Sequence, residues 1–341
     1  MRMQTLPSHP QLRQGSPVVS GMARFDPALG AWILSSYADV SAALRDARLS
    51  VSGSGAAPRE AQTTFRDAAS RALSPTRLAA WRVAMERSAI RCAESLPEGE
   101  PVELVGAFAR PWSTDVAAMV SGASLPESTR LAAPAREIFL AAASATSSEP
   151  QPHTHRAIAE LARALPGPDP VIAVQAFVAL SQTLPCLLAG AWFQLLWHPE
   201  TIHQLRATTG LVPRCVDELL RLASPSRAVF RTAIANTQIG AATIAKGEPV
   251  ILMIAIANLD PAQFADPTRL DPERGATAHL ALGMGMHPCL GAALVRMAVG
   301  IATTALLDAT SHVELAGQVE WLDGFSIRAP ATLPVLLRRS V

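Results

Sequence analysis

The run from Val171 to Trp197 contains no charged residue, and it constrains the fold more than any other part of the chain. A run this long and apolar either spans a bilayer or forms a helix buried on all sides in a soluble protein. Its centre carries Ser181, Gln182 and Thr183, followed by Pro185. Each of these polar groups would be costly in a single helix facing lipid. The sequence therefore favours a buried central helix, and the polar cluster at its middle indicates a site.

The rest of the chain predicts a mainly α protein with a minor β part. Val, Ile and Thr are enriched between residues 228 and 257, which indicates short strands with a turn at Lys246-Gly247. Further strands are expected over 317–341, and no run of residues is typical of a linker, so we expect one domain over residues 1–341. Apolar residues recur at helical spacing over 37–47, 60–73, 75–95, 101–120, parts of 126–165, 200–209, 213–222 and about 289–307.

Composition limits the possible partners and compartments. Lys and Arg number 29 against 28 Asp and Glu, so the formal net charge of +1 gives no global basic field that would attract nucleic acid. The segment from Met1 to Pro17 is polar and lacks the apolar region of a signal peptide. We therefore expect a cytoplasmic protein that neither spans a membrane nor binds nucleic acid. The cysteines are widely spaced, which argues against a zinc site or a disulfide framework: Cys92, Cys186, Cys215 and Cys289.

A glycine-rich loop carries Cys289 to the start of the last long predicted helix. Glycines at 283, 285 and 291 allow a tight backbone that approaches something flat or bulky. At a helix start, free backbone N–H groups and the helix dipole favour a thiolate. The loop could equally be a turn in which Cys289 only fills space. A phosphate-binding loop is disfavoured because no Gly-Lys-Ser/Thr follows.

The loop resembles the haem-binding signature of the cytochrome P450 family, Phe-Gly-x-Gly-x-His-x-Cys-x-Gly. Every specified position matches except the first, where Leu282 replaces Phe. The resemblance implies haem b bound between the central helix and this loop, with Cys289 as the iron ligand and His287 hydrogen-bonded to a propionate. It also implies that Leu282, Gly283 and Gly291 shape the cofactor's surroundings. A thiolate ligand is a strong electron donor that favours cleavage of the O–O bond.

Other family motifs occur before the loop. Glu218 and Arg221 lie three residues apart and can meet on one helix face, which alone would indicate a surface ion pair of small value. They resemble the family's Glu-x-x-Arg motif, which implies a buried structural triad with Arg274. Arg66 and Arg231 match family positions that bind propionates through charge-assisted hydrogen bonds. Taken alone, each of these two arginines could also be a solvated surface charge.

The central helix departs from the family pattern. The family usually shows Ala-Gly-x-Asp/Glu-Thr in its oxygen-binding stretch, where Thr183 here matches the alcohol and Gln182 replaces the acid. A carboxyl group can shuttle the protons that cleavage of dioxygen needs, whereas an amide can only hydrogen-bond or hold water. Thr183 and Gln182 are the candidate catalytic residues, although Gln182 and Ser181 could simply satisfy each other in the core. Pro185 cannot donate to the carbonyl of Ser181, so we expect a distortion of the helix there.

The resemblance implies a monooxygenase that oxidises a small organic substrate, in secondary metabolism. Electrons would come from NAD(P)H through a reductase and a separate ferredoxin or flavodoxin. The chain is short around 50–60 and 120–170, where the family roofs its pocket, so a bulky or carrier-bound substrate is a further hypothesis. Alternatives are a P450 that uses peroxide or catalyses a non-hydroxylation reaction, and a haem-binding sensor without catalysis. Seven arginines between residues 59 and 91 could form a basic patch for an acidic redox partner, or could be scattered charge that only keeps the protein soluble. They are Arg59, Arg66, Arg71, Arg77, Arg82, Arg87 and Arg91.

Overall fold

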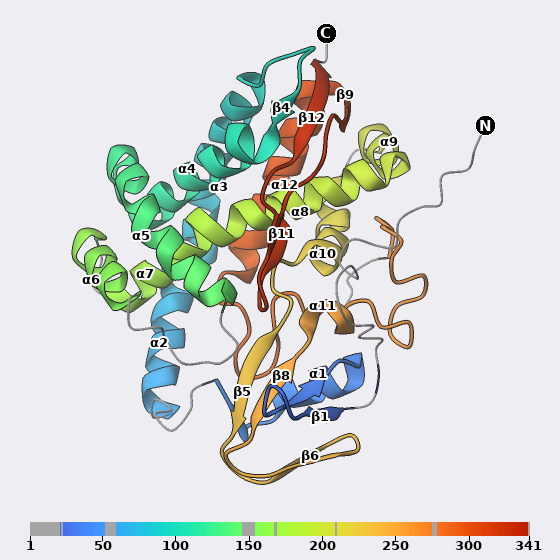
Figure 1. The fold of residues 1–341 in the computed structure, drawn as a ribbon. Helices are drawn as coiled ribbons and strands as arrows, with labels where there is room; N and C mark the ends of the chain where they lie inside the picture. Colours follow the sequence, from blue (N-terminus) through green and yellow to red (C-terminus); the bar gives the residue numbers. More distant parts are fainter. Residues whose placement is uncertain are drawn as a thin grey trace.

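The computed structural model describes residue 21 and residues 23–51, 59–144, 154–166, 169–208, 210–274 and 278–339. Helices form most of the molecule, as the sequence predicts (Figure 1). Two single-turn π-helices interrupt them: η2 (Val105–Ala109) precedes α4, and η3 (Ala179–Thr183) joins α7 to α8. The helices are α1 Tyr37–Arg45, α2 Arg59–Ala72, α3 Pro75–Glu94, α4 Arg110–Ser121, α5 Leu125–Ser144, α6 Thr154–Ala164, α7 Pro170–Val178, α8 Leu184–Trp197, α9 Pro199–Ala207, α10 Leu211–Ala223, α11 Ile254–Ala257 and α12 Ala292–Ala309.

The β part consists of small sheets. The largest has the strand order β1-β2-β8-β5-β3, in which β2 and β8 are parallel and the other pairs antiparallel. A second sheet, β4-β12-β9, brings the end of the described chain back beside η2, while β6 pairs with β7 and β10 with β11. The strands are β1 Arg24–Asp26, β2 Ala31–Leu34, β3 Leu49–Ser50, β4 Val102–Glu103, β5 Val229–Ala233, β6 Thr237–Ile239, β7 Ala242–Ile244, β8 Pro249–Leu252, β9 Thr310–Leu315, β10 Trp321–Asp323, β11 Arg328–Pro330 and β12 Pro334–Arg339.

The uncharged run forms one continuous helical rod from α7 through η3 to α8, at the centre of the helical part (Figure 1). Burial is nearly complete along α8, which packs against α10 and α12. The start of α7 is different, because Val171 is 55% exposed. The prediction of a helix buried on all sides is therefore right for α8 and wrong for the beginning of α7. The rod from α7 to α8 and helix α12 are each long and apolar enough to span a membrane. Half of each apolar stretch is, however, buried inside the protein.

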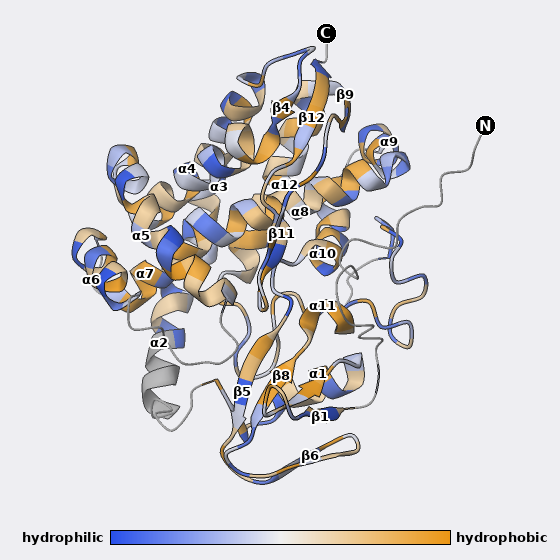
Figure 2. Cartoon of the chain, viewed as in Figure 1, coloured by the Kyte–Doolittle hydropathy of each residue, from blue (hydrophilic) through white to orange (hydrophobic). Residues whose placement is uncertain are grey.

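The core divides into two main apolar clusters. The larger cluster joins α3, α4, α8, α10 and α12, and it contains fully buried Trp112 and Leu188. A second cluster lies between α1, α11 and the five-stranded sheet, around Leu34, Val250 and Ile254. Figure 2 shows α8, β5, β8 and α11 coloured mainly hydrophobic, while α6 and α9 carry many hydrophilic positions. The two clusters give the molecule a helical part and a β-rich part.

Candidate functional site

The glycine-rich loop folds tightly against the end of α1. Gly283 and Gly285 have φ values of 67° and 68°, in the left-handed region that favours glycine. A Cβ atom on Gly285 would collide with the carbonyl oxygen of Leu44, so the close approach of loop and helix requires glycine there. The backbone N–H of Cys289 donates to the carbonyl oxygen of Leu282 at 2.7 Å and closes the loop. Helix α12 begins at Ala292, three residues later than predicted.

Two adjoining cavities, of about 310 and 830 Å³, lie between the central helix and this loop. Leu282, Gly283 and Thr183 line the smaller cavity, and Arg66 and Gly291 line the larger one. The side chain of Cys289 is accessible at the boundary between the cavities. Residues that line both are Ala179, Leu180, His287, Pro288, Cys289 and Val295. The loop and the middle of the central helix therefore form shared walls of two adjoining cavities, and Cys289 lies on the wall that they have in common.

The electrostatics around Cys289 combine opposing effects. Burial raises the pKa of its thiol, because the surrounding protein disfavours the charged form. The backbone N–H of Gly291 and the positive charge of Arg296 act in the opposite direction and lower that pKa. Cys289 thus lies three residues before the helix start at which it was predicted, although a backbone N–H near that start still acts on it. Burial is the largest influence on the pKa of the thiol.

Three basic side chains converge on the cavities from different elements. Arg231 on β5 is only 6% exposed, and its Nη1 donates to the carbonyl oxygen of Phe230 at 2.8 Å. Burial lowers its pKa to about 10. Arg66 on α2 donates to the carbonyl oxygen of Met286 in the loop. The pKa of His287 is lowered by burial and by the charges of Arg231 and Arg66.

This basic cluster lacks a counter-charge within the part of the chain that the structure describes. No acidic side chain there forms an ion pair with Arg231 or Arg66. A buried cation without a partner is costly, so the arrangement suits a ligand that brings carboxylates. The described residues also contain no cluster of three or more His, Cys, Asp or Glu side chains able to hold a metal ion. One cysteine opposite a basic wall fits haem, which carries its own metal ligands and two propionates.

The polar cluster of the central helix lies on η3. The N–H of Leu184 donates to the carbonyl oxygen of Ala179 five residues earlier, so the helix is widened immediately before Pro185. The predicted distortion is confirmed, in the form of a π turn. Thr183 at the end of this turn lines the smaller cavity. Ser181 Oγ instead donates to the carbonyl oxygen of Phe177 at 2.7 Å.

Gln182 points away from the site. It is 6% exposed, and it is not among the residues that line either cavity. Its Nε2 atom lies 3.4 Å from Ser181 Oγ and 3.4 Å from the carbonyl oxygen of Ala132 on α5. The structure therefore brings Thr183 but not Gln182 to the cavity wall. These contacts match the alternative in which Gln182 and Ser181 satisfy each other's hydrogen bonds in the core.

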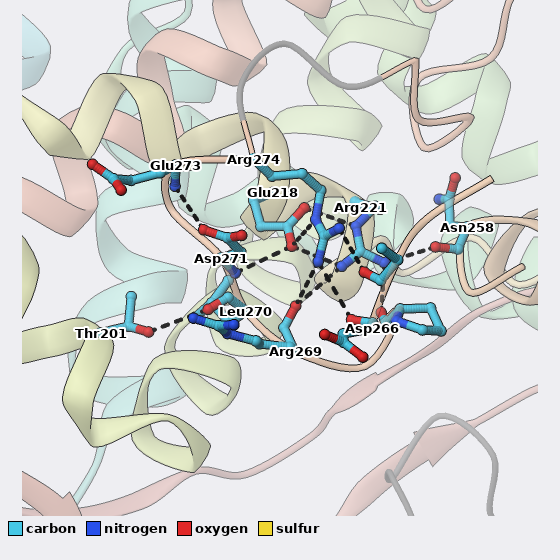
Figure 3. Close-up of polar contacts among 12 residues, drawn as sticks. Thr201, Glu218, Arg221, Asn258, Asp266, Arg269, Leu270, Asp271, Glu273 and Arg274 are labelled. Carbon is cyan, nitrogen blue, oxygen red and sulfur yellow. Dashed lines mark hydrogen bonds and ion pairs between the residues drawn. The ribbon is translucent and has the colours of Figure 1, made fainter. Parts of the chain in front are cut away.

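The predicted triad is confirmed (Figure 3). Arg221 donates from Nε and Nη2 to the two carboxylate oxygens of Glu218, both at 2.7 Å, and Arg274 Nε donates to Glu218 Oε1 at 2.9 Å. Arg221 Nη1 also donates to the carbonyl oxygens of Asn258 and Pro267, at 2.8 and 2.7 Å. These bonds join α10 to the segment before the loop. The triad does not line either cavity and is therefore structural.

Two features near the site escape sequence reasoning. Asp217 on α10 forms an ion pair with Arg296 and accepts a hydrogen bond from His279, and these two residues lie on either side of the loop in sequence. Asn258 accepts the N–H of Leu280 at 2.7 Å and holds the start of the loop. The sequence feature that could have pointed to Asp217 is its position directly before Glu218 of the Glu-x-x-Arg motif.

The basic residues of α2 and α3 are mostly on the surface. The side chain of Arg59 lies outside the described residues, and Arg82 lies 3.7 Å from Glu86. The exposed ones are Arg71, Arg77, Arg82, Arg87 and Arg91.

Comparison with known proteins finds a family match in the segment that carries the triad and the cysteine loop. The family model described as Cytochrome P450 matches residues 198–319. The chain is 34% identical over 167 residues to pentalenic acid synthase of Streptomyces avermitilis, a match that covers 48% of this chain and 42% of that protein. The matched segment thus spans less than half the length of that relative.

Two further matches extend over nearly the whole chain. Mycinamicin IV hydroxylase/epoxidase of Micromonospora griseorubida is 28% identical over 378 residues, covering 96% of this chain and 94% of that protein. The crystal structure of P450BioI in complex with an acyl carrier protein ligated to hexadec-9Z-enoic acid superimposes with a TM-score of 0.78 at 23% identity, covering 90% of this chain and 92% of that one.

Proposed function

Because the chain belongs to the cytochrome P450 family, we propose that it is a haem-thiolate monooxygenase that oxidises a small organic substrate. The observation that carries the proposal is an accessible cysteine between two adjoining cavities, each lined by an arginine that has no acidic partner among the described residues. In this proposal Cys289 is the iron ligand of haem b. Arg66 and Arg231 hold the propionates, because their positive charge otherwise has no acidic partner among the described residues, and His287 donates a hydrogen bond to one of them.

Bound haem would supply the iron centre at which dioxygen is activated. The chain's residues would position the reacting groups and control water and protons. Thr183 is the residue of η3 with a polar side chain that lines the smaller cavity. We therefore propose that its hydroxyl holds a water molecule that carries protons. Leu180, Leu184 and Ile254 line the same cavity and would keep other water away from an apolar substrate. We assign Gln182 a positioning role, through Ser181 and α5.

The proposed partners follow from charge and from the relatives. Exposed arginines on α2 and α3 suit an acidic ferredoxin or flavodoxin that receives electrons from NAD(P)H through a reductase. The names of the relatives, which include a hydroxylase/epoxidase and a synthase of an organic acid, support a small organic substrate made in secondary metabolism. One solved relative is bound to a ligated acyl carrier protein, which supports a carrier-bound substrate as a narrower option. We place the protein in the cytoplasm, a reducing compartment that fits its four free cysteines.

A second function is favoured by the position of Gln182. Since neither a carboxyl group nor Gln182 from η3 lines the cavity beside Thr183, any proton delivery from η3 rests on the Thr183 hydroxyl and water. A reaction driven by peroxide, which needs no reduction of dioxygen, would tolerate this arrangement. A reaction other than hydroxylation, or a haem-binding sensor without catalysis, would also tolerate it.

The spectrum of the reduced, carbon-monoxide-bound protein tests the proposal. The wild type and a Cys92→Ser control should show the Soret band typical of a thiolate ligand, and Cys289→Ser should lose it. The same band should form when NAD(P)H, a reductase and a surrogate ferredoxin are the only reductants. Protein that binds no haem, or a thiolate band that persists in Cys289→Ser, would overturn the proposal. Haem that accepts no electrons from ferredoxin but turns over with peroxide would favour the second function.

A further inference from the structure

One carboxylate oxygen of Asp217 ties together two residues that flank the cysteine loop. Oδ1 accepts from Arg296 Nε at 2.7 Å and from His279 Nε2 at 3.1 Å. His279 lies before the loop and is buried, whereas Arg296 lies on α12, seven residues after Cys289. Burial alone would raise the pKa of Asp217, but the hydrogen bonds from Arg296 and His279 lower it below its usual range. The carboxylate is therefore ionised at neutral pH.

The first arm of this network reaches the backbone of Cys289. His279 Nδ1 accepts the N–H of Ala281 at 3.2 Å, so Nε2 must carry the proton that is donated to Asp217. Burial lowers the pKa of His279, which therefore stays neutral while holding both partners. The next residue, Leu282, accepts the N–H of Cys289 through its carbonyl oxygen at 2.7 Å. Asp217 thus fixes the segment to which the cysteine is bonded.

The second arm is electrostatic. Arg296 is 43% exposed and lies in a separate cavity of about 630 Å³ between α3, α10 and α12, which Asp217 also lines. It does not line the two cavities that Cys289 faces. It nevertheless lies only four residues, about 6 Å along the helix, after Ala292, where α12 leaves the cysteine loop. Its charge is therefore within the screening length of about 10 Å at 0.1 M salt of the end of that loop. The charge of Asp217 lies directly against that of Arg296 and opposes its effect.

We propose that Asp217 is a positioning residue for the cysteine ligand, which fixes the loop through His279 and offsets the charge of Arg296, and thereby sets the reduction potential of the bound haem. This inference rests on the proposed function, because it needs haem bound at Cys289. A positive charge near the iron favours the reduced state, and a negative charge favours the oxidised state.

Charge variants test the electrostatic arm by the sign of the change. Asp217→Asn removes a negative charge and should raise the reduction potential, whereas Arg296→Gln removes a positive charge and should lower it. The double variant should return close to the wild type, and Asp217→Glu, which keeps the charge, should stay there. A purely structural ion pair would be broken by either single substitution, so both would shift the potential in the same direction or leave it unchanged.

A matched control makes the same charge change further along α12. Asp308→Asn removes a carboxylate that lines the same cavity twelve residues beyond Arg296, about 18 Å along the helix. Its effect should be much smaller, because that distance exceeds the screening length of about 10 Å at 0.1 M salt. Potentials should be measured by spectroelectrochemistry at low salt, on protein whose haem content and carbon-monoxide band are already verified. If the Asp217→Asn protein binds no haem, the shift in reduction potential of Arg296→Gln is compared with that of Asp308→Asn. A clearly larger shift in Arg296→Gln would then support the electrostatic arm.

Two results would overturn the inference: equal signs for the two single variants, or a shift in Asp308→Asn as large as in Arg296→Gln. Loss of the thiolate band in the wild type would instead contradict the proposed function. The two failures are therefore distinguishable.

Discussion

Arg231 is a buried cation whose counter-charge is absent from the described residues. In the haem-free protein its burial is a cost, and with haem bound it becomes half of a charge-assisted pair. We therefore predict opposite effects of Arg231→Leu on stability and on cofactor binding. The haem-free variant should be more stable to urea by about 1–3 kcal/mol, the scale of an unsatisfied buried polar group. Its affinity for haem should fall by about 10- to 100-fold.

Arg48→Leu provides the control for this prediction. Arg48 is an exposed arginine that already pairs with Asp46 at 2.8 Å, so its loss should change haem affinity little. Urea unfolding of the haem-free proteins and haem titration of each variant are the two measurements. An Arg231→Leu protein that is destabilised without haem and binds haem as tightly as the wild type would refute a role in holding propionates.

At the scale of elements, Glu218 joins α10 to the segment that precedes the loop. Its carboxylate accepts from Arg221 and Arg274, and Arg221 is fully buried. Glu218→Gln leaves that buried guanidinium without its charge partner, so we predict a loss of about 3–5 kcal/mol in the free energy of unfolding. Glu273→Gln changes an exposed neighbour and should cost less than about 0.5 kcal/mol. Denaturant unfolding of both variants checks this, and equal losses would show that the triad has no special stabilising role.

The elements also show what the sequence could predict. Local chemistry was sufficient where it acts along the chain: α1 lies within the predicted range 37–47, and the predicted distortion is found at η3, just before Pro185. The expected helix over 101–120 instead begins with β4 and η2, because pairing of β4 with β12 at the far end of the chain overrides local helical spacing. Strand β9 was missed for the same reason, since its partner is also β12.

The candidate site was predictable to the extent that it follows a contiguous motif. Leu282, Gly283, His287 and Cys289 all line the cavities, and their roles remain predictions. The orientation of Gln182 was not predictable, because it depends on how the π turn rotates the helix toward α5. The Asp217 network was missed because it joins residues from three separate segments.

At the scale of the whole molecule, the two apolar clusters meet across the proposed haem site. The smaller cavity is lined by Leu180, Leu184 and Leu220 from the helical cluster, and by Leu44 and Ile254 from the β-rich cluster. A ligand that fills this space would contact both parts at once. That the chain behaves as one domain over residues 1–341 is therefore a prediction that depends on the cofactor.

We predict that haem couples the two parts during unfolding. Calorimetry of the haem-bound protein should give one cooperative transition, because ligand that binds only the folded state stabilises both clusters together. Haem-free protein should unfold at a lower temperature, and in two steps or with a calorimetric enthalpy above the van't Hoff enthalpy. In the haem-free protein, hydrogen exchange should rise first along η3 and the cysteine loop, because these segments line the cavities of the proposed haem site. A haem-free protein that unfolds in one step at the temperature of the haem-bound form would mean that the clusters are coupled by their own packing, since the cofactor would then add nothing to the cooperativity of the chain.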